Sequence, residues 1–417
     1  MTALPPSISP CSNVRRTCYI LLKNKSFEDG GNRGVAIASK PLDELGTSIA
    51  NSITQQKKEH TETSFLSTES CINNLTFASW DEENWHYTAS NYKRVGFTIE
   101  EINQQRFERV ALYVMVMDTI NFCFWPCTDS EDESDSGMKN LLEYEHLASA
   151  LKMLAEKDDT INGEQNMGTL PTRAEDSYLL APQNLVKLNT ESFLELMTPL
   201  LPPTPQESKE KYIISNASER VRLLNEMAQA LLTFHHGSAT HFISQSHKSS
   251  DLLVHNILQY FPGFRDTAND PTGRWVAFYK RAQILVSDLW AALGSEQGEE
   301  KHGLDICNFT DMGMITTFPD YRIPQLLRSM GVLKYAPSLA AKVDKNVELR
   351  ASSMDELYIR AATVVAVDML VENVRGKVRL KEEINSVKMD WYLWNIGEKL
   401  DRQGKLSPHH RVRTIFY

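Results

Sequence analysis

The sequence predicts a mainly α-helical chain with few or no strands, and three observations lead to that prediction. Between residues 276 and 293, apolar side chains recur every three or four positions, and Gly294 follows as a natural end. A second helix begins at Ser353, where Glu356 three residues later completes a capping-box pattern. Strict alternation of apolar and polar residues, which is typical of a half-buried strand, is scarce along the chain.

The remaining elements follow from the same signals, taken in chain order. The run Val110–Met117 is apolar throughout, so it is either a buried strand or a buried helix. Asn216 with Glu219 resembles a capping box at the start of a helix that ends at Gly237. Pro324 suits the first turn of a further short helix. Helices are also expected over residues 42–56, 141–154 and 251–261.

We interpret the chain as an N-terminal extension followed by one large domain. Residues 1–75 mix Pro, Ser, Thr and Lys with few apolar patches, so we expect them to be variable and partly disordered, with residues 2–13 frayed. Residues 76–417 form the domain. Two polar stretches, near 128–138 and 158–180, are predicted surface insertions in it.

Composition and charge limit the possible functions. The chain has 417 residues, of which 41% are hydrophobic and 24% charged, so a sizeable core is available. The formal net charge of −10 argues against wrapping a nucleic-acid backbone. Apolar runs are far shorter than the ~18–20 residues that cross a membrane, and no signal-peptide core precedes them. We therefore expect a cytoplasmic protein with reduced cysteines and no membrane contact.

The motifs of several common binding and catalytic sites are absent from the sequence. There is no Gly-rich phosphate loop, no His-Glu-x-x-His and no nucleophile elbow. Cys123 and Cys127 lack a second cysteine pair, and the histidines between residues 235 and 247 are separated mostly by small polar residues. We therefore expect neither a metal nor a cofactor.

The stretch from Thr316 to Gln325 places a carboxylate, a phenol and a guanidinium side by side. Proline on either side of Asp320 stiffens the backbone, and a helix begins directly afterwards. Asp320, Tyr321 and Arg322 should therefore lie on a rigid loop at a helix N-terminus, where developing charge can be stabilised. The alternative is an Asp–Arg ion pair that only ties the loop down.

Three aspartates are embedded among aromatic residues: Asp118, Asp320 and Asp390. Carboxylates against apolar walls cleave glycosidic bonds, and neighbouring aromatic rings can stack a flat base. A phosphate could be held by Lys280, by Arg322 or by Arg411 and Arg413. The alternatives are ion-paired core acids and a Lys280 that lies at the surface.

The sequence resembles the queuosine salvage family, the queuosine 5′-phosphate N-glycosylase/hydrolases. Short motifs in family order, spanning about residues 76–417, carry the resemblance. They are Ala78-Ser79-Trp80 with His86, Met117-Asp118-Thr119-Ile120-Asn121-Phe122-Cys123-Phe124-Trp125, residues 278–286 (FYKRAQILV), residues 318–325 (FPDYRIPQ), Glu383-Ile384-Asn385-Ser386 with Asp390, and His410-Arg411-Val412-Arg413. Trp80 and His86 lie farther apart than is usual for the family, and Asn395 stands where an acid is familiar.

The resemblance implies a helical fold similar to helix-hairpin-helix DNA glycosylases. It also implies hydrolysis of the N-glycosidic bond of queuosine 5′-monophosphate, which releases queuine for reuse in tRNA. By the same resemblance Asp390 or Asp320 is the catalytic carboxylate, and we favour Asp390 for the chemistry and Asp320 for holding the base. The implied substrate-binding residues are His86, Asp118, Asn121, Phe122, Lys280, Phe318, Pro319, Tyr321, Arg322, Trp391 and Asn395.

Two other functions remain open at this point. A non-catalytic helical protein that binds a modified base or nucleotide would use the same aromatic and basic residues without a poised carboxylate. A glycosylase acting on a base within DNA or RNA would need a basic track, which the net charge of −10 disfavours. We therefore expect a small-molecule substrate, no direct contact with a polynucleotide, and a monomer.

Overall fold

The computed structural model describes residues 9–23, 34–59, 86–94, 96–125, 142–164, 178–202, 212–294, 304–378 and 384–417. Helices dominate these residues, so the predicted mainly α fold is confirmed. The α-helices are α1 (Pro10–Lys23), α2 (Ser39–Glu59), α3 (Ile99–Ile120), α4 (Tyr144–Glu164), α5 (Pro182–Leu185), α6 (Thr190–Met197), α7 (Ala217–Phe234), α8 (Ala239–Ser244), α9 (Ser250–Tyr260), α10 (Lys280–Leu293), α11 (Arg322–Ser329), α12 (Pro337–Asp344), α13 (Met354–Arg375) and α14 (Ser386–Arg402). The similarity to helix-hairpin-helix glycosylases stays a prediction.

Short strands and 3-10 turns join the helices. The 3-10 turns are η4 (Thr198–Leu200), η5 (Pro262–Phe264) and η6 (Met312–Met314). Strand β1 (Val35–Ile37) pairs antiparallel with β4 (Leu333–Tyr335), and β2 (Thr267–Asn269) pairs antiparallel with β3 (Trp275–Ala277). Strand β5 (Glu348–Leu349) pairs in parallel with β6 (Arg411–Val412). Each pair is a two-stranded sheet, so helix packing carries the fold.

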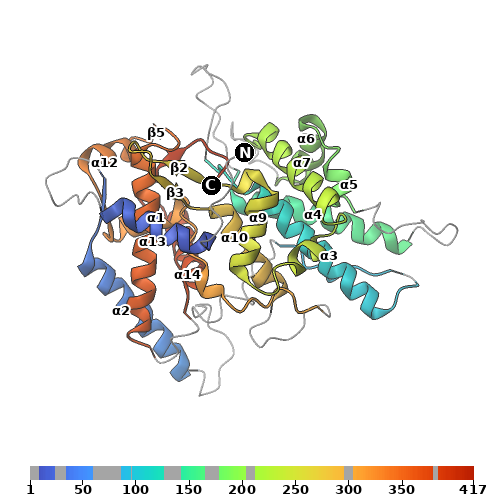
Figure 1. Ribbon diagram of the computed structural model, residues 1–417, viewed down its shortest axis with the longest axis horizontal. Helices are drawn as coiled ribbons and strands as arrows, with labels where there is room; N and C mark the ends of the chain where they lie inside the picture. The colour runs from blue at the N-terminus through green and yellow to red at the C-terminus, as the bar shows by residue number, and fades with distance from the viewer. Residues whose placement is uncertain are drawn as a thin grey trace.

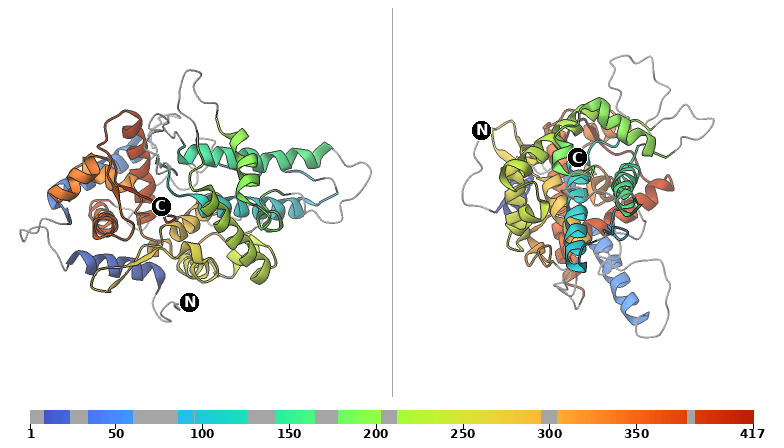
Figure 2. Two further views of the ribbon diagram at one scale, coloured as in Figure 1. Left: turned by 90° about the horizontal axis from the view of Figure 1, so that it is seen from above. Right: turned by 90° about the vertical axis from the view of Figure 1, so that its right-hand side faces the viewer.

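One hydrophobic core runs through most of the molecule. Helix α10 packs against α3 and α9, while α13 packs against α1, α2 and α14 (Figure 1). Residues from α1, α3, α7, α13 and α14 belong to the same cluster of buried apolar side chains. In the turned view of Figure 2, the N-terminal helices and the C-terminal third lie at one end of the molecule, and α3 and α4 extend toward the other.

The N-terminal segment is packed into this core. Residues 10–13, which we expected to be frayed, belong to α1, so that expectation was wrong for them. Cys11, Val14 and Cys18 are fully buried, because one apolar face of α1 lies against α13 and β3. The predicted helix over residues 42–56 is confirmed as α2. A domain boundary near residue 75 stays a prediction, since residues 60–85 lie outside the described ranges.

The structure decides one open alternative, and two other details differ from the sequence expectations. The apolar run before Asp118 is helical, within α3, which decides between strand and helix. The helix expected from residue 276 begins only at Lys280, because Tyr279 adopts a left-handed backbone (φ 51°) after strand β3. Asn216 is also left-handed (φ 52°), and its side chain does not cap α7, so the predicted capping box was wrong.

The two predicted insertions are only partly described. Residues near 128–138 lie outside the described ranges, as do residues 165–177. Residues 158–164, which we expected to form a loop, belong to α4, and Asp159 is buried there. Its carboxylate accepts a 2.8 Å hydrogen bond from the Tyr87 hydroxyl and pairs with Arg109 at 3.3 Å, so this part of the stretch is structural.

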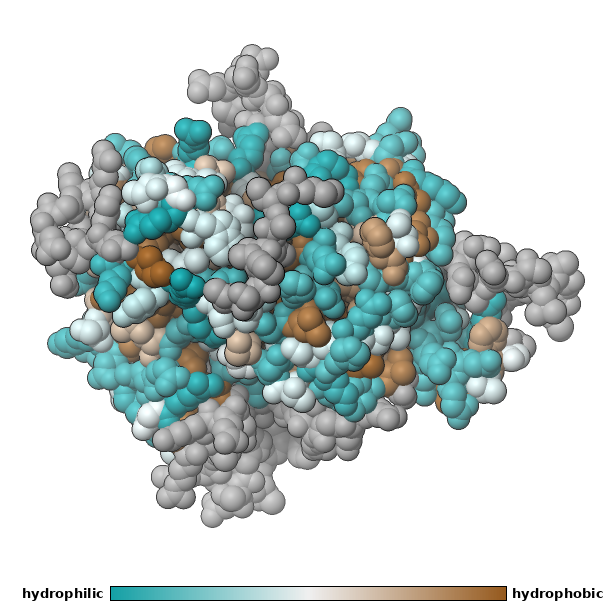
Figure 3. All heavy atoms as spheres, in the orientation of Figure 1, coloured by the Kyte–Doolittle hydropathy of each residue, from teal (hydrophilic) through white to brown (hydrophobic). Residues whose placement is uncertain are grey.

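The described surface is mixed in character. Figure 3 shows one face, on which hydrophobic residues are scattered among hydrophilic ones. Single exposed hydrophobic residues are normal on a protein surface. Among the helices that the structure describes, none combines the length and the apolar character needed to cross a membrane.

Candidate active site

Three of the predicted site residues, Asp118, Asp320 and Asp390, act electrostatically on Lys280, the first residue of α10. The side chain is buried, with only 4% of its surface exposed, so the alternative of a surface lysine was wrong. Burial lowers the pKa of Lys280, while the nearby carboxylates of Asp320, Asp118 and Asp390 act to raise it. Elements that are far apart in the sequence therefore bring one ammonium group and three carboxylates together.

Asp390 is a buried acid where the loop that carries Phe318 meets α14. It lies in the second turn of α14, whose N-terminus is capped by Asn385 through a 3.0 Å bond from the Lys388 N–H. Its Oδ2 accepts a 2.8 Å hydrogen bond from the Phe318 N–H and a second bond from the Thr317 hydroxyl. Burial, assisted by the charge of Asp320, raises the pKa of Asp390 to about 7, although both hydrogen bonds act to lower it.

Asp320 holds the start of α11. Its Oδ1 accepts hydrogen bonds from the backbone N–H groups of Arg322 (2.8 Å) and Ile323 (3.2 Å), so the expected position at a helix N-terminus is confirmed. The alternative, an ion pair between Asp320 and Arg322, was wrong. Arg322 instead pairs with Glu398 at 2.7 Å and Asp401 at 2.9 Å on α14. Its guanidinium therefore has carboxylate partners behind the loop.

Asp118 adds a carboxylate from the last turns of α3. It is completely buried, and it has no strong hydrogen-bond donor. Its Oδ1 accepts only a long 3.4 Å bond from Asn121, and its Oδ2 has no hydrogen-bond partner among the described residues. Burial raises the pKa of Asp118 to about 7, while Asn121 and Lys280 act to lower it. An acid in this setting holds a proton near neutral pH, as acid–base catalysis requires.

One residue of this cluster was missed in the sequence. Asp288 lies two turns after Lys280 on α10 and is 6% exposed. Burial raises its pKa well above the ordinary value, the charges of Asp118 and Asp390 raise it further, and Lys280 lowers it. The signal was present, since a spacing of eight residues puts Asp288 on the same helix face as Lys280.

Aromatic side chains line up along α14 and the segments beside it. Trp391 stacks on Trp290 of α10, with ring centroids 6.0 Å apart and an angle of 19°. Trp394 meets the ring of Tyr144 edge-on at 6.2 Å. Such rings provide flat apolar faces next to Asp390, as base stacking requires. Asn395, one turn after Trp391, is exposed.

His86 reaches this aromatic group although it is remote in the sequence. Its Nε2 lies 2.9 Å from the hydroxyl of Tyr144, which is 3.2 Å from the sulfur of Met117, the neighbour of Asp118. Tyr144 was not predicted as a site residue, because nothing near it in the sequence resembles a motif. Burial is the main cause that raises its pKa, and Asp288 and Asp118 raise it further.

Phe122, Tyr321 and Pro319, which were also predicted to bind the substrate, make contacts with other side chains of the protein. The Phe122 ring lies under the guanidinium groups of Arg220 (4.4 Å) and Arg281 (5.4 Å). Tyr321 packs against His409 at 4.6 Å, and the Pro319 carbonyl accepts a 3.0 Å bond from Arg360. The loop that carries Phe318 is thus fixed on both flanks.

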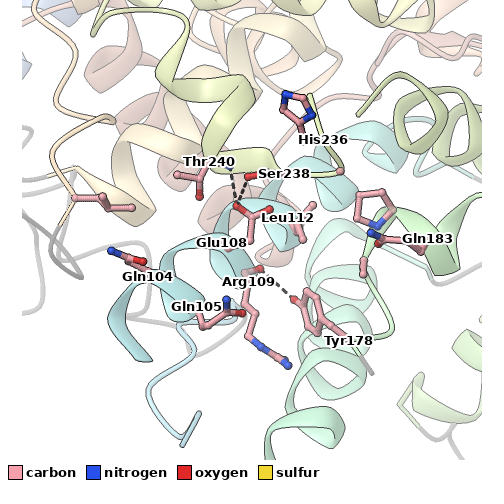
Figure 4. Close-up of a pocket in the computed structure, with 14 residues that line it drawn as sticks. Gln104, Gln105, Glu108, Arg109, Leu112, Tyr178, Gln183, His236, Ser238 and Thr240 are labelled. Atoms are coloured by element: carbon pink, nitrogen blue, oxygen red, sulfur yellow. Dashed lines mark hydrogen bonds between the residues drawn. The ribbon is translucent and has the colours of Figure 1, made fainter. Parts of the chain in front are cut away.

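A surface cavity lies away from this cluster. Its lining includes Glu108 and Arg109 in the middle of α3, and Figure 4 shows Glu108 bonded to Ser238 and Thr240. Asp118 is ten residues farther along the same helix, or ~15 Å at 1.5 Å per residue. The buried cluster is the candidate active site, because it contains the acids with raised pKa values and the lysine.

Among the residues that the structure describes, no group of three or more His, Cys, Asp or Glu side chains is arranged to hold a metal ion. His235, from the histidine-rich stretch, packs against the rings of Tyr260 (4.5 Å) and Phe242 (4.9 Å).

Known proteins resemble this chain over most of its length. A family model described as queuosine salvage protein matches residues 101–417. The queuosine 5′-phosphate N-glycosylase/hydrolase of Dictyostelium discoideum is 33% identical over 340 residues, covering 81% of this chain and 85% of the relative. Proteins with the same name from Sphaerobacter thermophilus and Mus musculus are 32% and 30% identical, covering 74% and 82% of this chain and 82% and 88% of their own lengths. The chain therefore belongs to the queuosine salvage protein family.

Proposed function

We propose that this protein hydrolyses the N-glycosidic bond of queuosine 5′-monophosphate and releases queuine for tRNA modification. The names of its relatives support this activity. The observation that carries it is Asp390: a buried carboxyl group, bonded through Oδ2 to Phe318 and Thr317, with its pKa raised to about 7. A protein that only bound the nucleotide would gain nothing from an acid poised in this way.

In the proposed reaction, the bond between C1′ of the ribose and the base nitrogen breaks, and its electron pair leaves with the base. Positive charge develops at C1′, where an ionised Asp390 stabilises it, and water supplies the hydroxyl group that completes the ribose. The departing base takes up a proton. Burial raises the pKa values of Asp118 and Asp288, so a protonated carboxyl group of this cluster can supply that proton.

The substrate contacts follow from the same arrangement. Phe318, Trp391 and His86 face the base, with Asp320 holding it at the loop. Lys280 is the candidate partner of the 5′-phosphate, because the guanidinium of Arg322 is bound to Glu398 and Asp401. Arg413 also pairs with a carboxylate, Glu348, at 3.6 Å.

The free nucleotide, rather than a polynucleotide, is the proposed substrate. The net charge of −10 opposes a long phosphate backbone but permits one phosphate at a buried lysine. In this proposal the protein works as a monomer in the cytoplasm.

The test is incubation of the purified protein with queuosine 5′-monophosphate, with free queuine followed by chromatography. Wild type, Asp390→Asn and Asp320→Asn are compared. Queuine release by wild type and its loss by ~10²–10⁴-fold in Asp390→Asn, with binding retained, would place the chemistry on Asp390. Release by Asp390→Asn but not by Asp320→Asn would move it to Asp320. A wild type that binds the nucleotide without turnover would leave only a binding protein.

A further inference from the structure

Arg360, in the middle of α13, lies where three segments of the site meet. Its side chain is 1% exposed and is enclosed between the rings of Phe278 and Tyr417, whose centroids lie 4.0 Å and 4.4 Å from the guanidinium carbon. Phe278 precedes Lys280 by two residues. The Tyr417 carbonyl accepts a 3.0 Å bond from the Cys123 N–H, just after Asn121 and Phe122. Arg360 thus contacts Phe278 and Tyr417, which lie beside the predicted substrate-binding residues Lys280, Asn121 and Phe122.

The first link from Arg360 runs to the loop that carries Phe318 and Asp320. The Arg360 Nε donates a 3.0 Å hydrogen bond to the carbonyl oxygen of Pro319, which lies between them. The neighbouring Phe318 N–H donates to Asp390. The backbone of this loop is therefore held on one side by Arg360 and on the other by the proposed catalytic carboxylate.

The second link runs to Lys280 through Asp266. The two terminal nitrogens of Arg360 donate to the two Asp266 carboxylate oxygens at 2.9 Å and 2.5 Å, in a bidentate pair. Asp266 Oδ2 also accepts a 3.2 Å bond from the Lys280 N–H. The Asp266 carbonyl accepts bonds from the Phe278 and Tyr279 N–H groups, at 3.0 Å and 3.2 Å. Asp266 therefore fixes the left-handed turn that aims Lys280.

We propose that Arg360 is a positioning residue for the reaction, which sets the Phe318–Asp320 loop and Lys280 at a fixed distance from each other and from Asp390. The proposal rests on the proposed function. It assigns Arg360 no contact with substrate. Only a planar fork can serve the Pro319 carbonyl and both Asp266 oxygens at once, and a lysine ammonium cannot. Buried ion pairs give little net stability, so geometry is the better explanation for this one.

Arg360→Lys tests this assignment, with Arg109→Lys as the matched control. Arg109 is 3% exposed, pairs with the buried Asp159 at 3.3 Å and lies over the rings of Tyr92 and Tyr178, both at 4.3 Å. Both substitutions keep a positive charge and weaken a buried ion pair. We expect kcat for queuine release to fall by ~10- to 100-fold in Arg360→Lys, as a small misplacement of reacting groups predicts. The kcat of folded Arg109→Lys should stay within about twofold of wild type.

The pH profile separates positioning from general destabilisation. If the loop drifts, the Phe318 N–H no longer lowers the pKa of Asp390, so that pKa rises. The acidic limb of the kcat profile should therefore move to higher pH in Arg360→Lys and stay in place in Arg109→Lys. Equal kcat losses and unshifted profiles in both variants would overturn the proposal.

Asp266→Asn keeps the test decisive if Arg360→Lys does not fold. The amide oxygen can retain the Lys280 N–H bond, but the bidentate pair with Arg360 is lost. A smaller kcat loss with the same direction of pH shift is expected, and an Asp266→Asn protein with wild-type kcat and profile would contradict the proposal. An inactive wild type would instead contradict the proposed function, so the two failures are distinguishable.

Discussion

The backbone N–H of Phe318 donates a 2.8 Å hydrogen bond to Oδ2 of Asp390, across 72 positions of the sequence. This bond joins the loop before α11 to the second turn of α14. The Thr317 hydroxyl donates to the same oxygen. The carboxyl group of Asp390 is thus oriented through Oδ2.

Thr317→Val should shift the pH dependence of the reaction. The Thr317 hydroxyl bonds to the ionised form of Asp390 and so lowers the pKa of that carboxyl. Valine has nearly the same shape but no donor, so the pKa of Asp390 should rise above its value of about 7. If Asp390 acts as the carboxylate, the acidic limb of kcat should move to higher pH. The control is Thr363→Val, because Thr363 is also buried and its hydroxyl donates a 2.9 Å bond to the Ile359 carbonyl. Identical limbs in wild type and Thr317→Val would exclude Asp390 as the titrating group.

Asp118→Asn should raise stability while lowering activity. The pKa of Asp118 is raised to about 7 in the folded protein, against about 3.9 when unfolded, so between these values only the unfolded chain ionises. Stability contributed by this group therefore falls as pH rises from about 4 to about 7. The neutral asparagine avoids that loss, so the melting temperature of Asp118→Asn should exceed that of wild type at pH 7.5. The gap should narrow toward pH 5.

The contrasting control for that measurement is Asp159→Asn. Asp159 is buried as well, but it pairs with Arg109 at 3.3 Å and accepts from Tyr87. Removing its charge takes a carboxylate away from the buried guanidinium of Arg109, which is destabilising. We expect a lower melting temperature for Asp159→Asn at pH 7.5. If Asp118→Asn also has a lower melting temperature than wild type at this pH, the Asp118 carboxyl group stabilises the fold at pH 7.5 instead of destabilising it.

The helical framework could be predicted from periodicity, but the junctions between helices could not. Helix α13 began at the expected cap, Ser353, because capping is a local interaction. The start of α10 was misplaced by four residues, since it depends on bonds from Phe278 and Tyr279 to the distant Asp266 carbonyl. Helix α1 was missed although its buried residues recur at helical spacing, because the polar, Pro-containing composition around it outweighed that pattern.

In the candidate site, too, local signals could be predicted from the sequence and contacts between distant residues could not. The local stretch around Asp320 predicted a helix N-terminus correctly, because the proline spacing is a local signal. The partner of Arg322 could not be predicted, since Glu398 lies 76 positions away. The proximity of Asp118, Lys280 and Asp390 came from the family resemblance rather than from spacing. Tyr144 lay outside every motif and emerged only from its contact with His86.

Lys280→Gln tests whether this lysine binds the 5′-phosphate. The amide keeps a donor but loses the charge, and a charge-assisted hydrogen bond contributes about 1.5–3 kcal/mol. We expect kcat/KM for queuosine 5′-monophosphate to fall by ~10- to 100-fold. The unphosphorylated nucleoside serves as the internal control, because it lacks the group that Lys280 would bind. Equal losses for the two substrates would assign Lys280 to the chemistry or to the fold instead.

Tyr144→Phe tests whether the contact between Tyr144 and His86 serves substrate binding. Removal of the hydroxyl frees His86 Nε2 from its 2.9 Å partner while the ring keeps its edge-on packing against Trp394. If His86 contacts the base, the KM for queuosine 5′-monophosphate should rise several-fold and kcat should change little. His86→Gln should give a similar increase. The double variant should be no worse than His86→Gln alone, because residues that act through one contact are not additive. Two independent, additive effects would show that Tyr144 and His86 act separately, and steady-state kinetics of the four proteins decides the point.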